Sequence, residues 1–562
     1  MANRTSVAEY GDATARRSVA HLLISHFTMK HFFLLSLCFA GFLAVCDENK
    51  CVADDDFSVI QNAITASIQK GPNGVVTLES GRIYRLGPRS EASGALTVIG
   101  AEGLTIDGNG ATLLVHPTCM VFAIAKSRKV TVKNLTIDYD PLPYTQAVIR
   151  SVTPESGTLT FSPMPGYVDP VVSDDYQDVL WSDAMFYDGA TRKMTHTFLR
   201  MRTISKNDDG TFSITYHGEP GHIFRVLSAR KPGDFLTIKL PYQRGEMLRD
   251  TDGRFLSANS GAIRAAFCHD VRIENVTLYA SPGQGFVATG SQGMVLDRYR
   301  VMRKPGTDRL ASICSDGAHF KSVSIMPKLS HCFFEGMMDD GVNVKISSAK
   351  VIEKHGKKLV IAHNDIAWDD IAMEPEMRVS FYDFDAKRHL GFAVLNSVKR
   401  TQYRLAEIEL DGDVPEVSPG VLLYTCPETL LEVTSCTFKT QFNNALLIRP
   451  SGIIHDCWFE DVNVGIHSIA HEPIEGPMPP GLMTVENCDF IRCDDAAVAL
   501  FVPSAESLSG ESKALKLSHC RFLLSNQEGT AIRFRKPLAV DWDDISVESS
   551  DGNTPVNPIR EF

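Results

Sequence analysis

A short motif recurs along the chain, each time as two polar residues, a Cys, any residue and a Phe. The copies read SHCFF, TSCTF, HDCWF, ENCDF and SHCRF, and their cysteines are Cys332, Cys436, Cys457, Cys488 and Cys520. From Cys436 onward the spacings are 21, 31 and 32 residues. Free cysteine behaves as a small buried hydrophobe, so each copy is expected to place its Cys in a core. Short units repeating every 20–30 residues or so, without helices between them, are typical of a β-solenoid with stacked coils.

Other apolar segments fit the same unit without a Cys. They are LTIDGNGATL (104–113), VTVKNLTIDY (130–139) and VRIENVTLYA (271–280). Their alternating pattern, rich in Val, Ile and Thr with Gly or Asn between, is typical of short strands joined by turns. A β-sandwich or propeller is the alternative, but neither predicts so irregular a period. We therefore expect an all-β fold, a right-handed parallel β-helix.

Two long stretches break this rhythm and are expected to be small inserted β-barrels, because they are strand-like and lack the coil motif. Residues 56–69 instead predict an amphipathic helix that caps the first coil, with strands beginning after residue 74. Insertions on one face of a solenoid commonly build its binding site. The expected divisions are an export region (1–46), cap and first coils (47–147), first insertion (148–241), coils with the candidate site (242–346), second insertion (347–428) and last coils (429–562).

The N-terminal region predicts export. A basic pair precedes FFLLSLCFAGFLAVC, whose 15 residues suit a signal-peptide core and are short for a membrane-spanning helix. Ala44 and Cys46 are the small residues expected before a cleavage site; a lipid attached to Cys46 is the alternative. We expect translation to start at Met29. In the alternative, residues 1–28 are part of the protein and form a long region before the apolar segment. We expect a periplasmic or cell-surface protein.

Charge and cysteine spacing restrict the ligands. The net charge is −12 and no basic cluster is present, which argues against nucleic acid as a partner. The thirteen cysteines include no Cys-x-x-Cys pair, so a zinc site is not expected. A neutral or cationic ligand, or a sugar, fits this composition better. No cofactor, metal or stable protein partner is inferred.

The segment MMDDGVNVKI (337–346) places Asp339 and Asp340 directly before a strand pattern. Strands rarely contain Asp, and adjacent like charges repel. Upstream, CSDGAHFKS contains Asp316, 23 residues before Asp339 and thus close to one coil away. Neighbouring strands lie about 4.8 Å apart, so Asp316 is expected on the rung beside the pair. A bend at Gly341 would let the acids project together as one exterior patch.

Three clustered carboxylates are suited to acid–base chemistry. Their repulsion should raise at least one pKa, leaving a protonated acid beside an ionised neighbour. A glycosidase needs that combination, with one acid for the leaving oxygen and one base for water. A turn-forming Asp-Gly and a calcium site are the alternatives.

The acid pattern resembles that of the β-helical polygalacturonases, with departures. Ser315 stands where that family has Thr, Met338 stands where it has Gly, and an insertion occupies the place of its His-Gly signature. An Arg-x-Lys clamp for uronates is not evident either. The departures put a uronate substrate in doubt.

The chain more closely resembles the exo-acting α-1,3-galactosidases of glycoside hydrolase family 110. NLTIDYDPLPYTQ (134–146), CSDGAHF and MMDDGVNVK are similar to segments of that family, as is the layout of a β-helix with two inserted barrels. The resemblance implies removal, with inversion, of terminal α-1,3-linked galactose from blood-group-B-type glycans and, in one subfamily, from linear glycans. It also implies that the catalytic acids are Asp316, Asp339 and Asp340, with Asp339 or Asp340 as general acid.

Weaker candidates for sugar binding are polar residues near these acids or on other coils. They are His319, Lys321, Asn343, Lys345, Asp138, Asp140, Trp368, Asn443, Asn444 and Arg449. An ordinary solvated surface explains most of them equally well.

Three other functions stay open. The first is a hydrolase of polygalacturonase type, and the second is a calcium-assisted lyase with Lys345 as its base. The third is a non-catalytic glycan-binding solenoid, although a binder has no use for clustered acids. A lyase would leave an unsaturated sugar that absorbs ultraviolet light. The sequence leaves open the oligomeric state and any need for a fucosylated acceptor.

Overall fold

The structure is a computed structural model, and its described residues lie between 56 and 561. Within that span it leaves out 89–93, 173–182, 242–260, 364–370, 384, 387, 403, 413–415, 450, 470–481, 502–511 and 535–537. The expected export region therefore lies outside the described residues. Among the residues that are described, no helix is long and apolar enough to cross a membrane.

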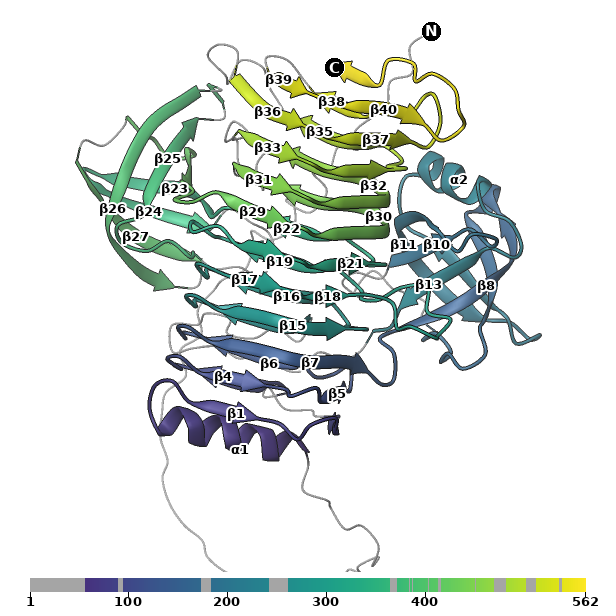
Figure 1. The fold of residues 1–562 in the computed structure, drawn as a ribbon, viewed down its shortest axis with the longest axis horizontal. Helices are drawn as coiled ribbons and strands as arrows, with labels where there is room; N and C mark the ends of the chain where they lie inside the picture. The colour runs from purple at the N-terminus through teal and green to yellow at the C-terminus, as the bar shows by residue number, and fades with distance from the viewer. Residues whose placement is uncertain are drawn as a thin grey trace, which may run out of the picture. The chain divides into compact units, whose positions relative to one another are not determined.

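Most of the described chain forms a parallel β-helix, as expected from the repeat (Figure 1). Each coil contributes strands to three stacks, and successive coils pair in parallel. The stack that carries the acids, called the site stack here, runs through β3 (Leu96–Ile99), β6 (Phe122–Ala125), β14 (Gly261–Ala266), β16 (Gln284–Thr289), β19 (Ala318–Lys321), β22 (Val342–Val344), β30 (Thr437–Ile448), β32 (Trp458–Ile469), β35 (Ala496–Phe501), β38 (Ile532–Phe534) and β41 (Ile559–Glu561).

The other two stacks complete each coil. The second contains β1 (Val75–Thr77), β4 (Thr105–Asp107), β7 (Thr131–Tyr139), β15 (Arg272–Leu278), β17 (Val295–Asp297), β20 (Lys328–Ser330), β29 (Leu431–Thr434), β31 (Gly452–His455), β33 (Met483–Glu486), β36 (Ser512–Ser518) and β39 (Leu538–Asp543). The third contains β2 (Ile83–Leu86), β5 (Thr112–Val115), β18 (Arg300–Val301), β21 (Phe333–Glu335), β34 (Asp489–Ile491), β37 (Arg521–Leu524), β40 (Ser546–Ser549) and the long strands β7, β15, β30 and β32, which turn a corner between stacks.

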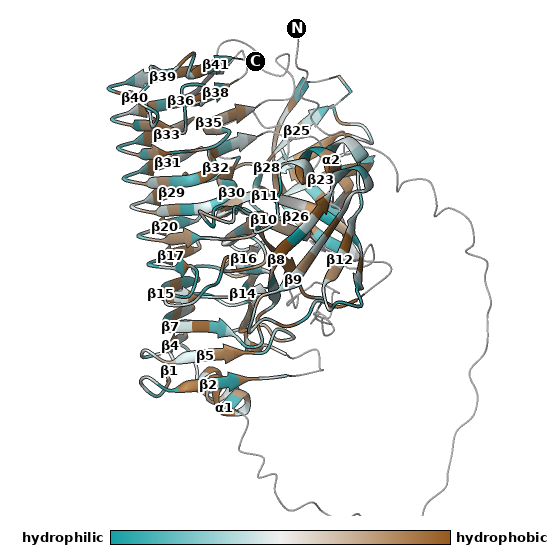
Figure 2. Cartoon of the chain, turned by 90° about the vertical axis from the view of Figure 1, so that its right-hand side faces the viewer, coloured by the Kyte–Doolittle hydropathy of each residue, from teal (hydrophilic) through white to brown (hydrophobic). Residues whose placement is uncertain are grey.

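The repeated motif contributes a stacked row of side chains to the core of the β-helix. Phe334, Phe438, Phe459, Phe490 and Phe522 stack face to face, with ring centroids 4.7–5.1 Å apart in successive pairs. The five motif cysteines are buried beside them, which confirms the prediction that they occupy one core position. Hydrophobic and hydrophilic residues alternate along the strands, as the colouring of Figure 2 shows. Parallel stacking brings identical side chains together because the coils repeat in register.

The polar residue before each motif Cys lies at a bend between two strands of the coil. His331, Ser435, Asp456, Asn487 and His519 all have left-handed backbones, with φ between 52° and 57°. Asn, Asp and His are the non-glycine residues that enter this region most readily. The local chemistry of the corner thus accounts for the polar residue that the motif carries there.

The helix predicted at 56–69 is α1 (Asp56–Gln69), and it covers the first coil. Phe57, Ile60 and Ile64 are buried against the coil. Gln61 accepts a hydrogen bond from the Thr97 backbone N–H at 2.7 Å and donates one to the Thr97 carbonyl at 3.1 Å. Its amide therefore satisfies backbone groups of β3 that would otherwise lie at an open edge.

The first insertion is a closed barrel, called barrel 1, of β8 (Tyr144–Thr153), β9 (Thr158–Pro163), β10 (Asp183–Tyr187), β11 (Met194–Lys206), β12 (Phe212–Tyr216) and β13 (Phe235–Lys239). It also contains the 3-10 turn η1 (Pro154–Ser156). Since β8 begins at Tyr144, the expected boundary at residue 148 falls inside a strand. The stretch also contains α2 (Pro220–Ser228), which the strand-like interpretation missed. The helix closes the barrel because Ile223, Val226 and Leu227 pack into its core.

The second insertion is also a closed barrel, called barrel 2. Its strands are β23 (Ser348–His355), β24 (Lys358–His363), β25 (Arg378–Asp383), β26 (Arg388–Gln402), β27 (Leu405–Asp411) and β28 (Leu422–Thr425). It follows β22 directly, so it lies between two coils in sequence. β22 nevertheless pairs with β30 on the far side of the insertion.

Candidate active site

Strand register brings the predicted acids together. β19 pairs with β22 so that Ala318 lies beside Val342, which places Asp316 beside Asp340. The Gly317 backbone N–H donates to the Asp340 carbonyl at 3.0 Å. Asp316, Asp339 and Asp340 each place a carboxylate oxygen within 4.8 Å of the other two. The expectation that Asp316 occupies the neighbouring rung is therefore confirmed.

The acids do not form an exterior patch, which corrects the prediction from the sequence. Asp316 and Asp340 are each only 3% exposed, and Asp339 is half-buried. A cluster on one side of the acids explains this burial, because barrel 1 packs there against the residues that flank them. It consists of Tyr144, Met185, Tyr187 and Met194 from barrel 1 and Leu310, Ala311, Cys314 and Met338 from the coils.

The glycines beside the acids are needed for space. Gly341 lies at a bend, as expected, although its φ is not positive. A Cβ at this position would lie 2.5 Å from the Ala445 carbonyl oxygen, and one at Gly317 would lie 2.6 Å from the Gly341 carbonyl oxygen. Only glycine lets the backbones of adjacent coils approach so closely beside each Asp.

Each acid has its own hydrogen-bond partner. Asp316 Oδ2 lies 2.5 Å from His319 Nδ1, and Asp316 Oδ1 accepts from the Asp340 backbone N–H at 3.2 Å. Asp339 Oδ1 accepts from the Asn443 amide at 2.7 Å.

Asp340 is bound by two side-chain amides. It accepts from the side-chain amides of Asn343 at 3.1 Å and Asn444 at 2.8 Å. Asn444 in turn bonds to His467 Nδ1 at 2.9 Å. Asn343, Asn443 and Asn444, which sequence reasoning ranked low, are therefore direct partners of the acids.

Burial raises the pKa of all three carboxyl groups, and repulsion by neighbouring acids adds to this at Asp339 and Asp340. Burial raises the pKa of Asp316 to about 6, against the opposing effect of Lys321 and Lys345. Burial and the Asp316 charge raise the pKa of Asp339 to about 8. The pKa of Asp340 is raised by burial and by both neighbouring acids. The cluster titrates as a unit and holds protons near neutral pH.

Three lysines surround the acids. Lys321 is the last residue of β19 and Lys345 directly follows β22, so the two lysines lie side by side, because Phe320 pairs with Val344. Lys239, which the sequence did not single out, ends β13 of barrel 1 and lowers the pKa of Asp316 and Asp339. No signal in the sequence pointed to Lys239, because only the docking of barrel 1 brings it near the acids.

Four further residues were candidates for sugar binding, namely Arg449, Asp138, Asp140 and Trp368. Arg449 is buried and directly follows Ile448, which pairs with Val344, so it lies beside Lys345. Asp138 is buried and bound to Lys304 at 2.9 Å and Arg309 at 2.8 Å. Asp140 is exposed and 3.8 Å from Arg85. Trp368 lies outside the described residues. The structure therefore does not support Asp138 or Asp140 as sugar ligands.

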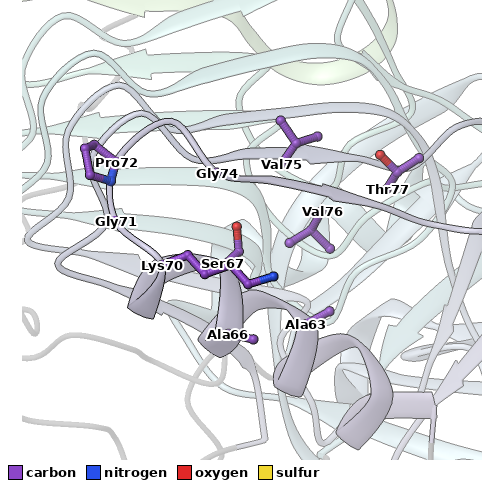
Figure 3. A pocket seen from close by; sticks show the side chains of 10 residues that line it. All are labelled: Ala63, Ala66, Ser67, Lys70, Gly71, Pro72, Gly74, Val75, Val76 and Thr77. Atoms are coloured by element: carbon purple, nitrogen blue, oxygen red, sulfur yellow. The ribbon is translucent and has the colours of Figure 1, made fainter.

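Two hollows lie elsewhere in the described structure. One of about 380 Å³ lies beside α1 and is lined mainly by small and apolar side chains (Figure 3). Another of about 550 Å³ lies between loop 302–309, Arg192 and Glu335. Neither contains an acid of the cluster.

The acid cluster has the donor chemistry of a hard-cation site. Within the described residues it is the one group of three acidic, His or Cys side chains close enough to share an ion. Calcium accepts oxygen ligands of this kind but usually takes six to eight of them. Three carboxylates that hold protons near neutral pH therefore fit acid–base chemistry at least as well.

Comparison with known proteins supports a relationship to galactosidases. No family model matches the chain. Alpha-1,3-galactosidase A of Bacteroides fragilis is 22% identical over 369 residues, which are 63% of this chain and 57% of that protein. Alpha-1,3-galactosidase B of Bacteroides thetaiotaomicron is 22% identical over 378 residues, which are 64% and 58% of the two chains. The chain thus spans less than two thirds of the length of these relatives, and it is distantly related to them.

Among solved structures, a polygalacturonase from Erwinia carotovora ssp. carotovora aligns over 89% of this chain and 93% of that one. The TM-score is 0.36 at 10% identity, and a likeness this weak supports no argument.

Proposed function

We propose that this protein is an exo-acting glycoside hydrolase that removes terminal α-1,3-linked galactose. The observation that carries the proposal is the cluster of two buried and one half-buried carboxyl group, all with raised pKa, contributed by adjacent coils. The distant relatives named alpha-1,3-galactosidase support the choice of bond. Blood-group-B-type glycans and linear α-1,3-galactosides are the proposed substrates.

The surroundings of the acids suggest a role for each. Asp339 is the most accessible of the three and keeps its proton up to about pH 8, so we assign it as the general acid. Asp316 ionises at lower pH, near 6, beside His319 and three lysines. Asp316 then deprotonates the attacking water, and Asp340, whose pKa is raised by both neighbouring acids, helps to hold that water.

Inversion of configuration is part of the proposal, and two observations bear on it in opposite directions. Inverting enzymes usually separate their carboxyl groups by about 6.5–9.5 Å and retaining enzymes by about 5–5.5 Å. The nearest oxygens here lie within 4.8 Å, which favours direct attack by one acid. A third acid favours inversion, because two carboxylates can share one water opposite the general acid.

Proton NMR in the first minutes of hydrolysis separates the two routes. Inversion predicts that β-galactose appears first, before mutarotation. If α-galactose appeared first, one of the three acids would be a covalent nucleophile.

Product analysis tests the activity itself. The substrates are B-type trisaccharide, linear α-1,3-galactobiose and an α-1,4-linked galactobiose as control. We expect free galactose from the first two and none from the third. Absence of galactose from all three would refute the proposal.

A calcium-assisted lyase is the second candidate, because the acids are close enough to share an ion and Lys345 lies beside them. A lyase would lose activity in EDTA, regain it with calcium, and form a product that absorbs in the ultraviolet. Under the proposed mechanism EDTA leaves the rate unchanged.

We also propose, from the N-terminal sequence alone, that the protein is exported; cell fractionation would test this.

A further inference from the structure

The site stack differs on the two sides of the acids. Towards the N-terminus, Val287 and Thr289, which pair with His319 and Lys321, are only 5% and 1% exposed. Barrel 2 closes on this region, since a Cβ at Gly290 would lie 2.7 Å from the Cβ of Ala372. Ile371 is buried and its carbonyl accepts from Arg400 at 3.0 Å, which holds the segment in place.

Towards the C-terminus, the column that begins at Asp339 continues as partly exposed polar residues. Asn443 donates to Asp339, and Asn444 pairs with Val464, so Asn443 lies beside Asn463. On the next coil the Asp495 backbone N–H donates to the Asn463 carbonyl at 2.9 Å. Asn443, Asn463 and Asp495 are all partly exposed.

Further groups frame this column. Arg533 forms two bonds of 2.6 Å with the Asp495 carboxylate and leaves 28% of its side chain exposed. Lys193, from the hairpin of barrel 1, reaches Asp494 at 3.0 Å, which anchors barrel 1 beside the same coils. The column is therefore lined by amide, carboxylate and guanidinium groups, which suit sugar hydroxyls because they offer both donors and acceptors.

We infer that the glycan enters from the C-terminal side: galactose lies over the acids, and the sugars to which it is attached lie along Asn443, Asn463 and Asp495. This inference rests on the proposed function and adds a direction and an acceptor-binding surface to it. Each coil rises about 4.8 Å, close to the length of one sugar residue. Closure by barrel 2 on the other side explains why only the end of a chain would be cleaved.

The test compares an aryl α-galactoside, which has a single sugar, with B-type trisaccharide. Asn463→Trp should block the column, and Asn463→Ala should remove one hydrogen-bonding group. We expect the ratio of kcat/KM for trisaccharide to that for aryl galactoside to fall at least tenfold in the first variant. In the second it should fall about fivefold, the effect of one hydrogen bond.

Thr484→Trp is the matched control, because Thr484 is partly exposed in the second stack, on another face of the helix. Its ratio should equal that of the wild type, and thermal melting checks that each variant is folded. An unchanged ratio in folded Asn463→Trp would overturn the inference while leaving the proposed function intact. A wild-type protein inactive on both substrates would instead refute the proposed function.

Discussion

At Asp339 a carboxyl group is buried deeply enough to stay protonated yet remains accessible enough to meet a substrate. Its Oδ1 accepts from Asn443 at 2.7 Å and from the Asp340 backbone N–H at 3.0 Å. These bonds favour the ionised form, but burial and the neighbouring Asp316 outweigh them. A strongly perturbed acid in such a cluster is typical of a catalytic site.

Replacing this acid should abolish most of the activity. Asp339→Asn keeps the size and the acceptor oxygen but cannot donate a proton to the leaving group. Loss of a general acid typically costs 10²–10⁴ in rate, and we expect a fall in kcat of that order on B-type trisaccharide. Asp385→Asn, in an exposed hairpin of barrel 2, is the control and should retain full activity. A near-normal kcat in Asp339→Asn would remove Asp339 from the mechanism.

Ionisation of Asp339 should lower the free energy of unfolding as the pH rises. A folded pKa of about 8 means that the folded state holds this proton more tightly than the unfolded state, where an Asp titrates near 3.9. The stabilisation is complete below about pH 4 and is lost as the pH rises through 8. We therefore expect Asp339→Asn to melt at a higher temperature than the wild type, by a margin that grows from pH 4 to pH 8. A margin independent of pH would contradict the raised pKa.

Among the elements, the short strands β19 and β22 position the acids through their register. Parallel pairing aligns Ala318 with Val342, and the preceding residues then meet without space for side chains at Gly317 and Gly341. The acids are thus held by backbone pairing, and their separation depends on how closely the coils approach.

Gly341→Ala should disturb this approach. The new Cβ would lie 2.5 Å from the Ala445 carbonyl oxygen, so the strands must separate. Overpacking of this kind costs about 1–3 kcal/mol, and we expect a lower free energy of unfolding together with a lower kcat. Gly452→Ala, where the nearest contact would be 3.3 Å, is the milder control. Chemical denaturation and kinetics measure both effects; equal stability of the two variants would show that the coils can adjust.

At the scale of the whole molecule, barrel 1 completes the site. Tyr144 donates from its hydroxyl to the Ala311 carbonyl at 2.6 Å, which ties β8 to the loop that leads into Asp316. The same docking brings Lys239 towards the acids. An insertion that looks peripheral in the sequence therefore determines the burial and the electrostatics of the site.

Tyr144→Phe tests this link. The substitution leaves the buried Ala311 carbonyl without its partner, at a cost of about 1–3 kcal/mol. We expect a lower melting temperature and, because the loop before Asp316 loses its anchor, a lower kcat/KM. Tyr84→Phe, which removes the hydroxyl that accepts from the Glu79 backbone N–H in the first coil, is the control for stability loss far from the site. A loss of kcat/KM no larger than in Tyr84→Phe would show that the barrel does not position the acids.

The sequence by itself determined the features that depend on local periodicity. The Cys-x-Phe motif, the amphipathic pattern of 56–69 and the interval from Asp316 to Asp339 each follow from one coil or helix, so the stacked core, α1 and the neighbouring acids could be predicted. Only the tertiary structure decided the burial of the acids, the steric role of Gly341, the approach of Lys239 and the partners of Asp138. The burial of the acids and the approach of Lys239 depend on how barrel 1 packs against the coils. The other two depend on contacts between coil residues far apart in the sequence, and such long-range contacts leave no periodic signal along the chain.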